Sequence, residues 1–122
     1  MLFIKPLKKS ELKTLSDNDS AMPSGCIVSN NLLSEKGKLK WCFREISINN
    51  MDSGWRFLSD IDTDEYLADA NNSSVCDLDT VIQIEPAILT IINLPVGTDV
   101  ELTAVDGKKM FVDMNSKEPL NN

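Results

Sequence analysis

The sequence predicts a single α+β domain: a mostly antiparallel, twisted sheet with short helices after residue 79 packed on it. Two observations predict this class. Several strand-type segments recur between residues 25 and 114, and the domain has two helical segments late in the chain, after residue 79. A chain of 122 residues can bury roughly 60–70% of its unfolded surface. We expect a basic N-terminal appendage and linker at 1–20, the domain at 21–115, and a C-terminal tail at 116–122.

The first two predicted strands lie on either side of a polar loop, residues 35–38. The earlier strand, Gly25–Ser29, is short and of buried type, and a turn through Asn30-Asn31 follows it. The later one, residues 39–46, alternates, which is typical of a half-buried strand. One of its faces carries Leu39, Trp41 and Phe43, and the other carries Lys40, Cys42 and Arg44. We expect the two strands to pair as a hairpin.

The middle of the chain predicts two more strands and two helical segments. Trp55–Leu58 is the third strand, and Gly54 supplies the permissive backbone for a sharp entry into it. Residues 73–77 predict a short further strand. Asp79 is a candidate N-cap for a helical segment at 80–84. Pro86 suits the first position of a second, largely buried helix at 87–93.

The last two strands are expected to form a hairpin around Asp106-Gly107. A two-residue turn there sets Leu102 opposite Phe111 but leaves Met110 and Val112 on the polar face. A three-residue loop, 106–108, aligns the apolar residues of both strands instead. Because register is fixed by burying one face, we favour the longer loop.

Charge is the least ordinary property of the chain. It carries 19 acids against 12 bases, a net charge of −7. Residues 52–79 hold eight of these acids and one base, Arg56, so this segment alone has a net charge of −7. Nucleic acid is therefore disfavoured as a partner, and a basic protein is favoured. No apolar run reaches the 18 residues of a membrane span.

Histidine is absent, which excludes His-based nucleophile systems and His-based metal sites. The three cysteines, at 26, 42 and 76, lack a C-x-x-C spacing and indicate reduced thiols in the cytoplasm, although a disulfide between two of them stays open. The basic N-terminal segment is either a tail folded over the acidic segment or a solvated helix or frayed terminus, and the second interpretation is favoured.

The acidic run Asp60-x-Asp62-x-Asp64 opens like a calcium loop but lacks the glycine and the bidentate glutamate that such a loop needs further on. Its carboxylates crowd one loop, which is a poor arrangement for acid–base catalysis. We therefore expect no catalytic residue, metal or cofactor. A partner-binding surface is expected instead, comprising Asp52, Arg56, Asp60, Asp62, Asp64, Glu65 and Tyr66.

Four residues are expected to hold the structure: Trp41, Gly54, Trp55 and Phe57. Of these, Trp41 and Phe57 are predicted to lie in the core. Arg56 and Tyr66 are predicted to be at least partly presented to a partner. An equally open alternative for Arg56 is internal pairing with Asp52 or Asp60.

Ordered motifs between Gly25 and about Thr103 carry a family resemblance. They are Cys26-Ile27-Val28-Ser29, Trp41-x-Phe43-Arg44-Glu45, Asp52-Ser53-Gly54-Trp55-Arg56-Phe57, Asp64-Glu65-Tyr66-Leu67, Asp77-Leu78-Asp79-Thr80-Val81 and Leu94-Pro95-Val96-Gly97-Thr98. On these motifs the chain resembles the immunity protein 33 domain family of bacterial polymorphic toxin systems, formerly a domain of unknown function. A glycine usual in that family near Ser59-Asp60 is missing here.

The resemblance implies a cytoplasmic, non-enzymatic protein that binds and neutralises a cognate toxin, which we expect to be basic. The identity of the toxin and the oligomeric state do not follow from it. Two alternatives stay open: a housekeeping or scaffold interaction domain without a toxin partner, and a carboxylate-based enzyme or small-ligand binder.

Overall fold

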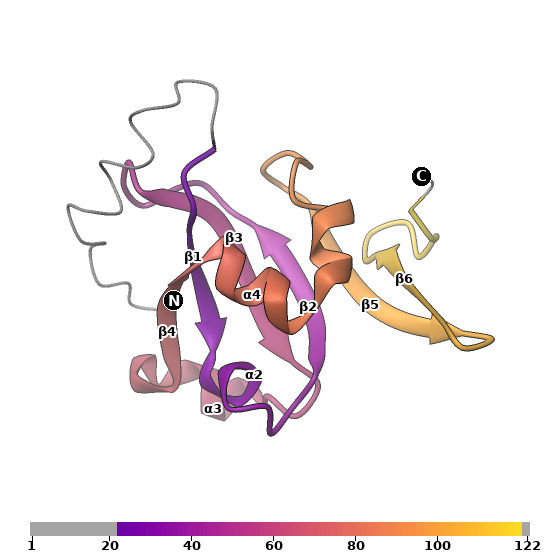
Figure 1. Cartoon of the computed structure of the whole chain (residues 1–122), viewed down its shortest axis with the longest axis horizontal. Coiled ribbons are helices and arrows are strands. Elements are labelled where there is room, and N and C mark those ends of the chain that lie inside the picture. Colours follow the sequence, from indigo (N-terminus) through magenta and orange to yellow (C-terminus); the bar gives the residue numbers. More distant parts are fainter. Residues whose placement is uncertain (1–21, 121–122) are drawn as a thin grey trace.

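Six extended segments form one sheet in the computed structural model, which describes residues 22–120 (Figure 1). The strands are β1 (Gly25–Ser29), β2 (Leu39–Arg44), β3 (Asp52–Ser59), β4 (Ser73–Asp77), β5 (Asp99–Val105) and β6 (Lys108–Asp113). Their spatial order is β4-β1-β3-β2-β5-β6, and only the β1–β3 pair is parallel. The predicted α+β class is confirmed. The appendage predicted at 1–20 lies outside the described residues.

Short helices connect the strands: α2 (Asn30–Leu33), α3 (Asp64–Ala68), the 3₁₀ turn η1 (Ala70–Asn72), α4 (Leu78–Ile84) and the 3₁₀ turn η2 (Pro86–Thr90). The sequence predicts only the last two. Helix α4 begins at Leu78, so Asp79 lies in its first turn, and the predicted N-cap role of Asp79 is wrong. Pro86 begins η2 as expected, but this segment is a tight 3₁₀ turn that ends at Thr90.

The predicted hairpin of β1 and β2 does not form, because β3 lies between them. Ile27 of β1 is opposite Arg56 of β3 in parallel register, and Cys42 of β2 is opposite Phe57 in antiparallel register. Seven of the eight β3 residues are buried. A strand buried on both faces belongs at the centre of a sheet, and this overrides the pairing of chain neighbours.

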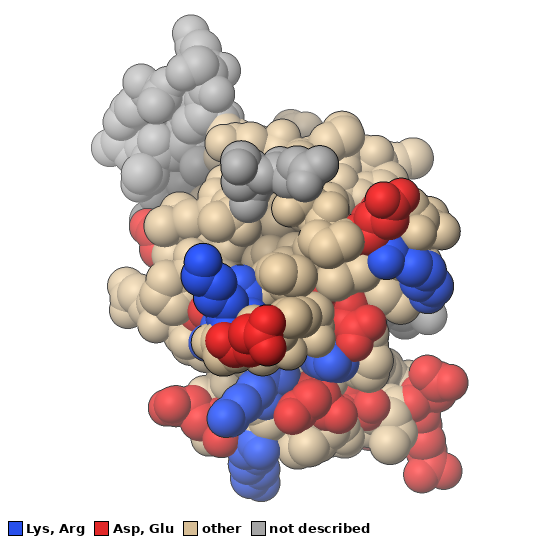
Figure 2. Space-filling model, turned by 90° about the vertical axis from the view of Figure 1, so that its right-hand side faces the viewer, with Lys and Arg blue, Asp and Glu red and all other residues tan. Residues whose placement is uncertain are grey.

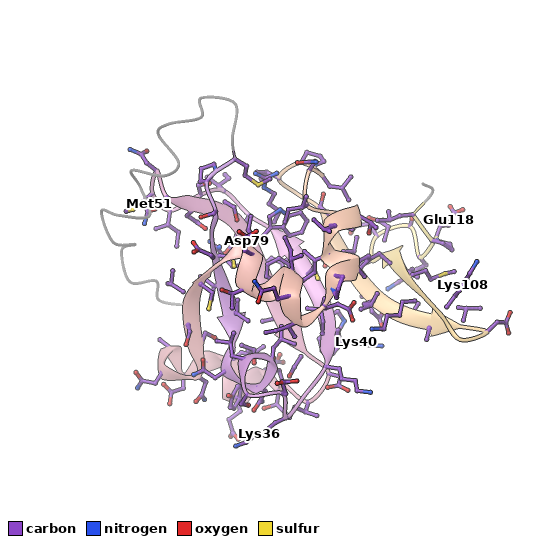
Figure 3. All side chains as sticks on the ribbon, viewed as in Figure 1. Lys36, Lys40, Met51, Asp79, Lys108 and Glu118 are labelled. Carbon is purple, nitrogen blue, oxygen red and sulfur yellow. The ribbon has the colours of Figure 1, made fainter. Side chains whose placement is uncertain are left out.

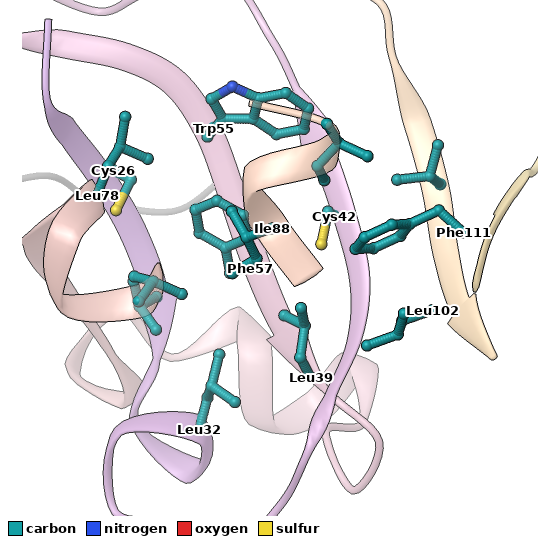
Figure 4. Close-up of a cluster of buried hydrophobic side chains, with 14 residues drawn as sticks. Cys26, Leu32, Leu39, Cys42, Trp55, Phe57, Leu78, Ile88, Leu102 and Phe111 are labelled. Atoms are coloured by element: carbon teal, nitrogen blue, oxygen red, sulfur yellow. The ribbon is translucent and has the colours of Figure 1, made fainter. Parts of the chain in front are cut away.

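Helix α4 and η2 cover one face of the sheet and enclose the core (Figure 1). In the close-up, Trp55 and Phe57 of β3 lie with Cys42, Ile88 and Phe111 (Figure 4). The rings of Trp55 and Phe57 stack with their centroids 5.9 Å apart. The indole N–H of Trp55 donates to the carbonyl of Ile92 at 3.1 Å, so the one polar atom of that side chain is satisfied.

A register shift in β2 changes which of its residues face the core. Leu39 pairs with Ser59, but Trp41 pairs with Leu58, so one extra residue is accommodated between the two pairs. Cys42 is therefore fully buried, whereas Trp41 is only half-buried on the opposite face. The prediction that Trp41 lies in the core is wrong, because it assumes unbroken alternation from Leu39 onward, whereas the bulge turns Trp41 to the other face of the sheet.

The β5–β6 hairpin has the two-residue turn, and the favoured three-residue loop is wrong. Leu102 lies opposite Phe111, and both are buried. Asp106 and Gly107 both have positive φ, 54° and 79°, as a type I′ hairpin turn requires. This register leaves Met110 and Val112 half-buried on the face that also carries Trp41. That face is not purely polar, so the assumption behind the longer loop fails.

The chain after β6 folds back along it. Pro119 forms an isolated bridge with Val112, and the N–H of Leu120 donates to the carbonyl of Phe111 at 2.9 Å. The Leu120 side chain packs against the core. The outer edge of β6 is therefore covered at residues 111–113.

Candidate partner-binding surface

The Asp-Ser-Gly-Trp-Arg-Phe block of β3 builds an ion cluster of Glu45, Asp52 and Arg56. We call it the buried ion cluster because Asp52 and Arg56 are buried, although the Glu45 side chain is 38% exposed. The Arg56 guanidinium donates from Nη1 and Nη2 to the two carboxylate oxygens of Asp52, both at 2.9 Å, and from Nε to Glu45 Oε2 at 2.6 Å. Arg56 is 0% exposed and Asp52 3% exposed. Such bidentate pairing is what allows both charges to be buried.

Backbone donors complete the buried ion cluster. Asp52 also accepts hydrogen bonds from the N–H groups of Ile48 and Gly54, both at 2.9 Å. Burial alone raises the pKa of Asp52, but the hydrogen bonds from Arg56, Ile48 and Gly54 outweigh it and hold the pKa below its usual value. For Arg56 the signs are reversed. Burial lowers the pKa of its guanidinium, but the hydrogen bonds to Asp52 and Glu45 outweigh burial and raise that pKa above its usual value. The cluster thus fixes the β2–β3 connection to β3.

Arg56 is not presented to a partner, and that prediction is wrong. Its donors are used inside the domain, and Asp52 is withdrawn from the surface with it. The alternative interpretation, internal pairing of Arg56 with Asp52, is the one that the structure shows. The sequence of an arginine followed closely by acids therefore does not indicate whether that arginine pairs inside the domain or contacts a partner.

The connection between β2 and β3 also requires a glycine at position 54. Its φ is +91°, and a Cβ at this position would lie 2.1 Å from the carbonyl oxygen of Glu45. The N–H of Glu45 donates to the carbonyl of Gly54 at 2.9 Å, so the two backbones are in direct contact. No residue with a side chain fits this approach.

The remaining predicted acids lie after β3, and they divide by exposure. Asp60, Asp64 and Glu65 are exposed, as is Asp69 nearby, and we call these four residues the acidic surface. Asp62 is instead turned inward. Its Oδ1 accepts from Ser29 Oγ and Asn31 Nδ2, both at 2.8 Å, and its Oδ2 accepts from the N–H of Ser59 at 2.7 Å. Asp62 therefore holds the loop to β1 and α2.

Helix α3 positions the centre of the acidic surface. Thr63 caps it by accepting from the N–H of Tyr66 at 3.0 Å. Asp64 and Glu65 occupy the first turn, where the helix dipole favours negative charge. Tyr66 is half-buried, and its carbonyl accepts from Asn72 Nδ2 at 2.8 Å, which joins α3 to η1.

Ile61 is an exposed apolar residue beside the acidic surface, and the sequence pattern does not single it out. It is 50% exposed and lies in the chain between Asp60 and Asp62. Its side chain is held against the backbone of Gly37, where an added Cβ would lie 2.8 Å from Ile61 Cγ1. The available signal was an isoleucine flanked by acids in a loop. Single exposed apolar residues are common on protein surfaces, so it is only the position of Ile61 between two acids that makes it a candidate contact.

The face beside the β5–β6 hairpin differs from the acidic surface, because its charges are mixed (Figure 2). A cleft of about 540 Å³ opens there between β2, α4 and the hairpin, and Asp60 lies at its rim. Three lysines line the cleft, and two of them are paired with acids: Lys109 with Glu85 at 2.5 Å, and Lys40 with Glu101 at 2.7 Å. The cleft therefore does not extend the acidic surface.

Within residues 22–120, no group of three or more His, Cys, Asp or Glu side chains is placed to hold a metal ion. No helix in the same range is long and apolar enough to cross a membrane.

One comparison with known proteins gives a match. The family model described as the Immunity protein Imm33 domain matches residues 26–113, which is more than half of the chain. No curated protein and no solved structure matches the chain. The matched range contains the buried ion cluster, the acidic surface and all six strands except the first residue of β1.

Proposed function

We propose that this chain is a non-enzymatic immunity protein that neutralises a cognate bacterial toxin by binding it. The chain belongs to the Immunity protein Imm33 domain family. Family membership is the observation that carries this proposal. It implies a toxin partner in general terms, and the features of the surface suggest how that partner is bound.

The acidic surface is the proposed contact. Asp64 and Glu65 are exposed side by side on α3, and Asp60, Ile61 and Asp69 lie next to that helix in the chain. Clustered exposed carboxylates raise the rate of encounter with an opposite charge, and an apolar group among them contributes the desolvated contact that retains the partner. The proposed toxin surface is therefore basic, with an apolar pocket or patch that receives Ile61.

A basic toxin surface suggests a mode of neutralisation. An enzyme that acts on a polyanion needs positive charge around its active site, and an acidic protein can occupy that region in place of the substrate. We propose that neutralisation works in this way, and that it takes place in the cytoplasm, where such a toxin would meet its substrate.

Co-expression tests the proposal. The protein encoded by the gene next to this one is expressed in a bacterial host with and without this chain. We expect growth arrest by the neighbouring protein alone, restored growth with the wild-type chain, and co-purification of the two. A chain with the Gly54→Ala substitution, which disrupts the fold, is the control and should not restore growth. Arrest that persists with the wild-type chain, without co-purification, contradicts the proposal.

A further inference from the structure

The two edges of the sheet are protected unequally. At the β6 edge, Pro119 and Leu120 lie along the strand, and Lys108-Lys109 begin it. At the opposite edge is β4, and no strand of residues 22–120 pairs with its outer side. Strand β4, with the sequence Ser-Ser-Val-Cys-Asp, has five residues and one charged side chain, Asp77, but it has none of the prolines, lysines or bulges that blunt an edge most strongly.

The hydrogen-bond pattern shows which backbone groups of β4 point outward. The N–H of Leu78 donates to the carbonyl of Ser24 at 2.7 Å, so the two residues form a hydrogen-bonded pair of the antiparallel ladder. Hydrogen-bonded pairs alternate with non-hydrogen-bonded pairs along an antiparallel ladder. The next two hydrogen-bonded pairs are therefore Cys76–Cys26 and Ser74–Val28, whereas Asp77–Gly25 and Val75–Ile27 are non-hydrogen-bonded. The N–H groups of Val75 and Asp77 therefore point away from β1. The register is continuous over all five β4 residues, so these donors are regularly spaced.

Charge surrounds this edge on both sides. Asp69 precedes β4 and caps η1, Asp77 ends the strand, and Asp79 follows in α4. No lysine or arginine occurs in the sequence between Arg56 and Lys108. The edge is also continuous with the acidic surface, because η1 joins α3 directly to β4, and Asn72 Nδ2 donates back to the Tyr66 carbonyl.

We propose that β4 is a docking strand for the partner: an extended, basic segment of the toxin pairs with the outer edge of β4 and extends the sheet. This inference rests on the proposed function and adds the form of the partner segment. The backbone donors of Val75 and Asp77 supply the pairing, and the flanking acids select lysine or arginine side chains in the incoming strand. Ile61 and α3 contact the toxin beyond that strand.

A matched pair of variants isolates the backbone contribution. Asp77 has φ −75° and ψ 148°, which proline adopts without strain. Asp77→Pro removes the outward N–H. Asp77→Ala keeps that N–H and loses the same carboxylate, including its bond from Ser24 Oγ. Any difference between the two variants in binding thus reports the backbone donor.

The probe is an alternating Lys/Val octapeptide, titrated into the full-length, isotope-labelled chain while backbone amide resonances are followed. We expect saturable shifts of the Val75 and Asp77 amides in the wild-type chain, and no shifts with a Glu/Val octapeptide. Asp77→Pro should bind the basic peptide about three- to tenfold more weakly than Asp77→Ala, as expected for one lost hydrogen bond. Amide spectra of both variants verify that they are folded.

Three results overturn the inference. The first is equal affinity of the two variants, and the second is peptide-induced shifts confined to α3. The third is protection of the Val75 and Asp77 amides from hydrogen exchange in the free chain, which would mean that another copy or another part of this chain already occupies the edge. The titration uses no toxin, so its failure leaves the co-expression result standing, and a failed co-expression leaves the titration result standing.

Discussion

The buried ion cluster and the acidic surface use the same kind of side chain for opposite purposes. Asp52 and Arg56 are in β3, and Asp60 follows that strand by one residue. In the cluster, Arg56 is fully enclosed and each of its nitrogens donates to a neighbour. On the surface, Asp64 and Glu65 are exposed on a five-residue helix. Burial, and not charge density, decides which acids hold the fold and which are available to a partner.

The difference has an energetic consequence. Removing one partner of a buried ion pair leaves an uncompensated charge in the interior and costs about 3–5 kcal/mol. Removing an exposed charge costs about 1 kcal/mol or less, but it changes the field that an approaching protein meets. Substitutions in the two regions should therefore separate stability from association.

Arg56→Ala should lower the free energy of unfolding by about 3–5 kcal/mol, because Asp52 is then buried without its cation. Denaturant titration followed by circular dichroism measures this loss. Lys40→Ala is the matched control, since it removes a cation paired to Glu101 with both side chains about 30% exposed, and it should cost about 1 kcal/mol or less. Equal losses in the two variants would contradict the structural role assigned to the cluster.

Asp62→Ala should lower the free energy of unfolding by about 1–3 kcal/mol, because Ser29 Oγ, Asn31 Nδ2 and the Ser59 N–H lose their acceptor. Asp64→Ala, an exposed acid two residues away, is the control. Thermal unfolding compares them. If the two midpoints fall equally, Asp62 belongs with the acidic surface and not with the fold.

The pKa of Asp52 predicts how stability depends on pH. Because the folded-state pKa is lowered, the contribution of Asp52 is complete above the pKa of an unfolded aspartate, about 3.9. It is lost as the pH falls below that value and through the lower folded pKa. Denaturant titrations at several pH values should show that the advantage of wild type over Asp52→Asn is constant above about pH 5 and shrinks below about pH 4. An advantage that grows on acidification would contradict this.

Much of the fold can be predicted from local pattern, and the failures share a cause. Strands β1 and β4 are predicted with their observed bounds because their composition and flanking turns are local signals. The parallel pairing of β1 with β3 is not predicted, because partner choice depends on which strand is buried on both faces. The bulge that moves Trp41 out of the core and the two-residue turn at Asp106-Gly107 depend on contacts across the sheet.

The candidate site divides in the same way. The concentration of acids after β3 is visible in sequence, and Asp60, Asp64 and Glu65 are indeed exposed. Whether Asp52, Arg56 and Asp62 point inward is not visible in sequence. Asp52 and Arg56 pair within β3, but their burial depends on the strands and the Glu45 connection packed around β3. Asp62 is held by Ser29 and Asn31, which are distant in the chain. Ile61 is missed because a single apolar residue in a loop carries no periodicity.

The central claim is that the exposed acids on α3 steer the partner, and one kinetic measurement tests it most directly. The association rate of the toxin encoded by the neighbouring gene is measured for Asp64→Lys/Glu65→Lys and for Asp99→Lys/Glu118→Lys. Each double variant changes the net charge equally. Asp99 begins β5 and Glu118 lies beyond β6, away from both α3 and β4 (Figure 3). Neither pair takes part in the buried ion cluster, so we expect both variants to remain folded.

At low salt the α3 variant should associate at least about tenfold more slowly than the control variant, and this gap should narrow as salt shortens the screening length from roughly 10 Å at 0.1 M to roughly 3 Å at 1 M. Equal slowing of both variants would mean that only the net charge matters. An unchanged rate in the α3 variant would place the interface elsewhere, and either result would contradict the account.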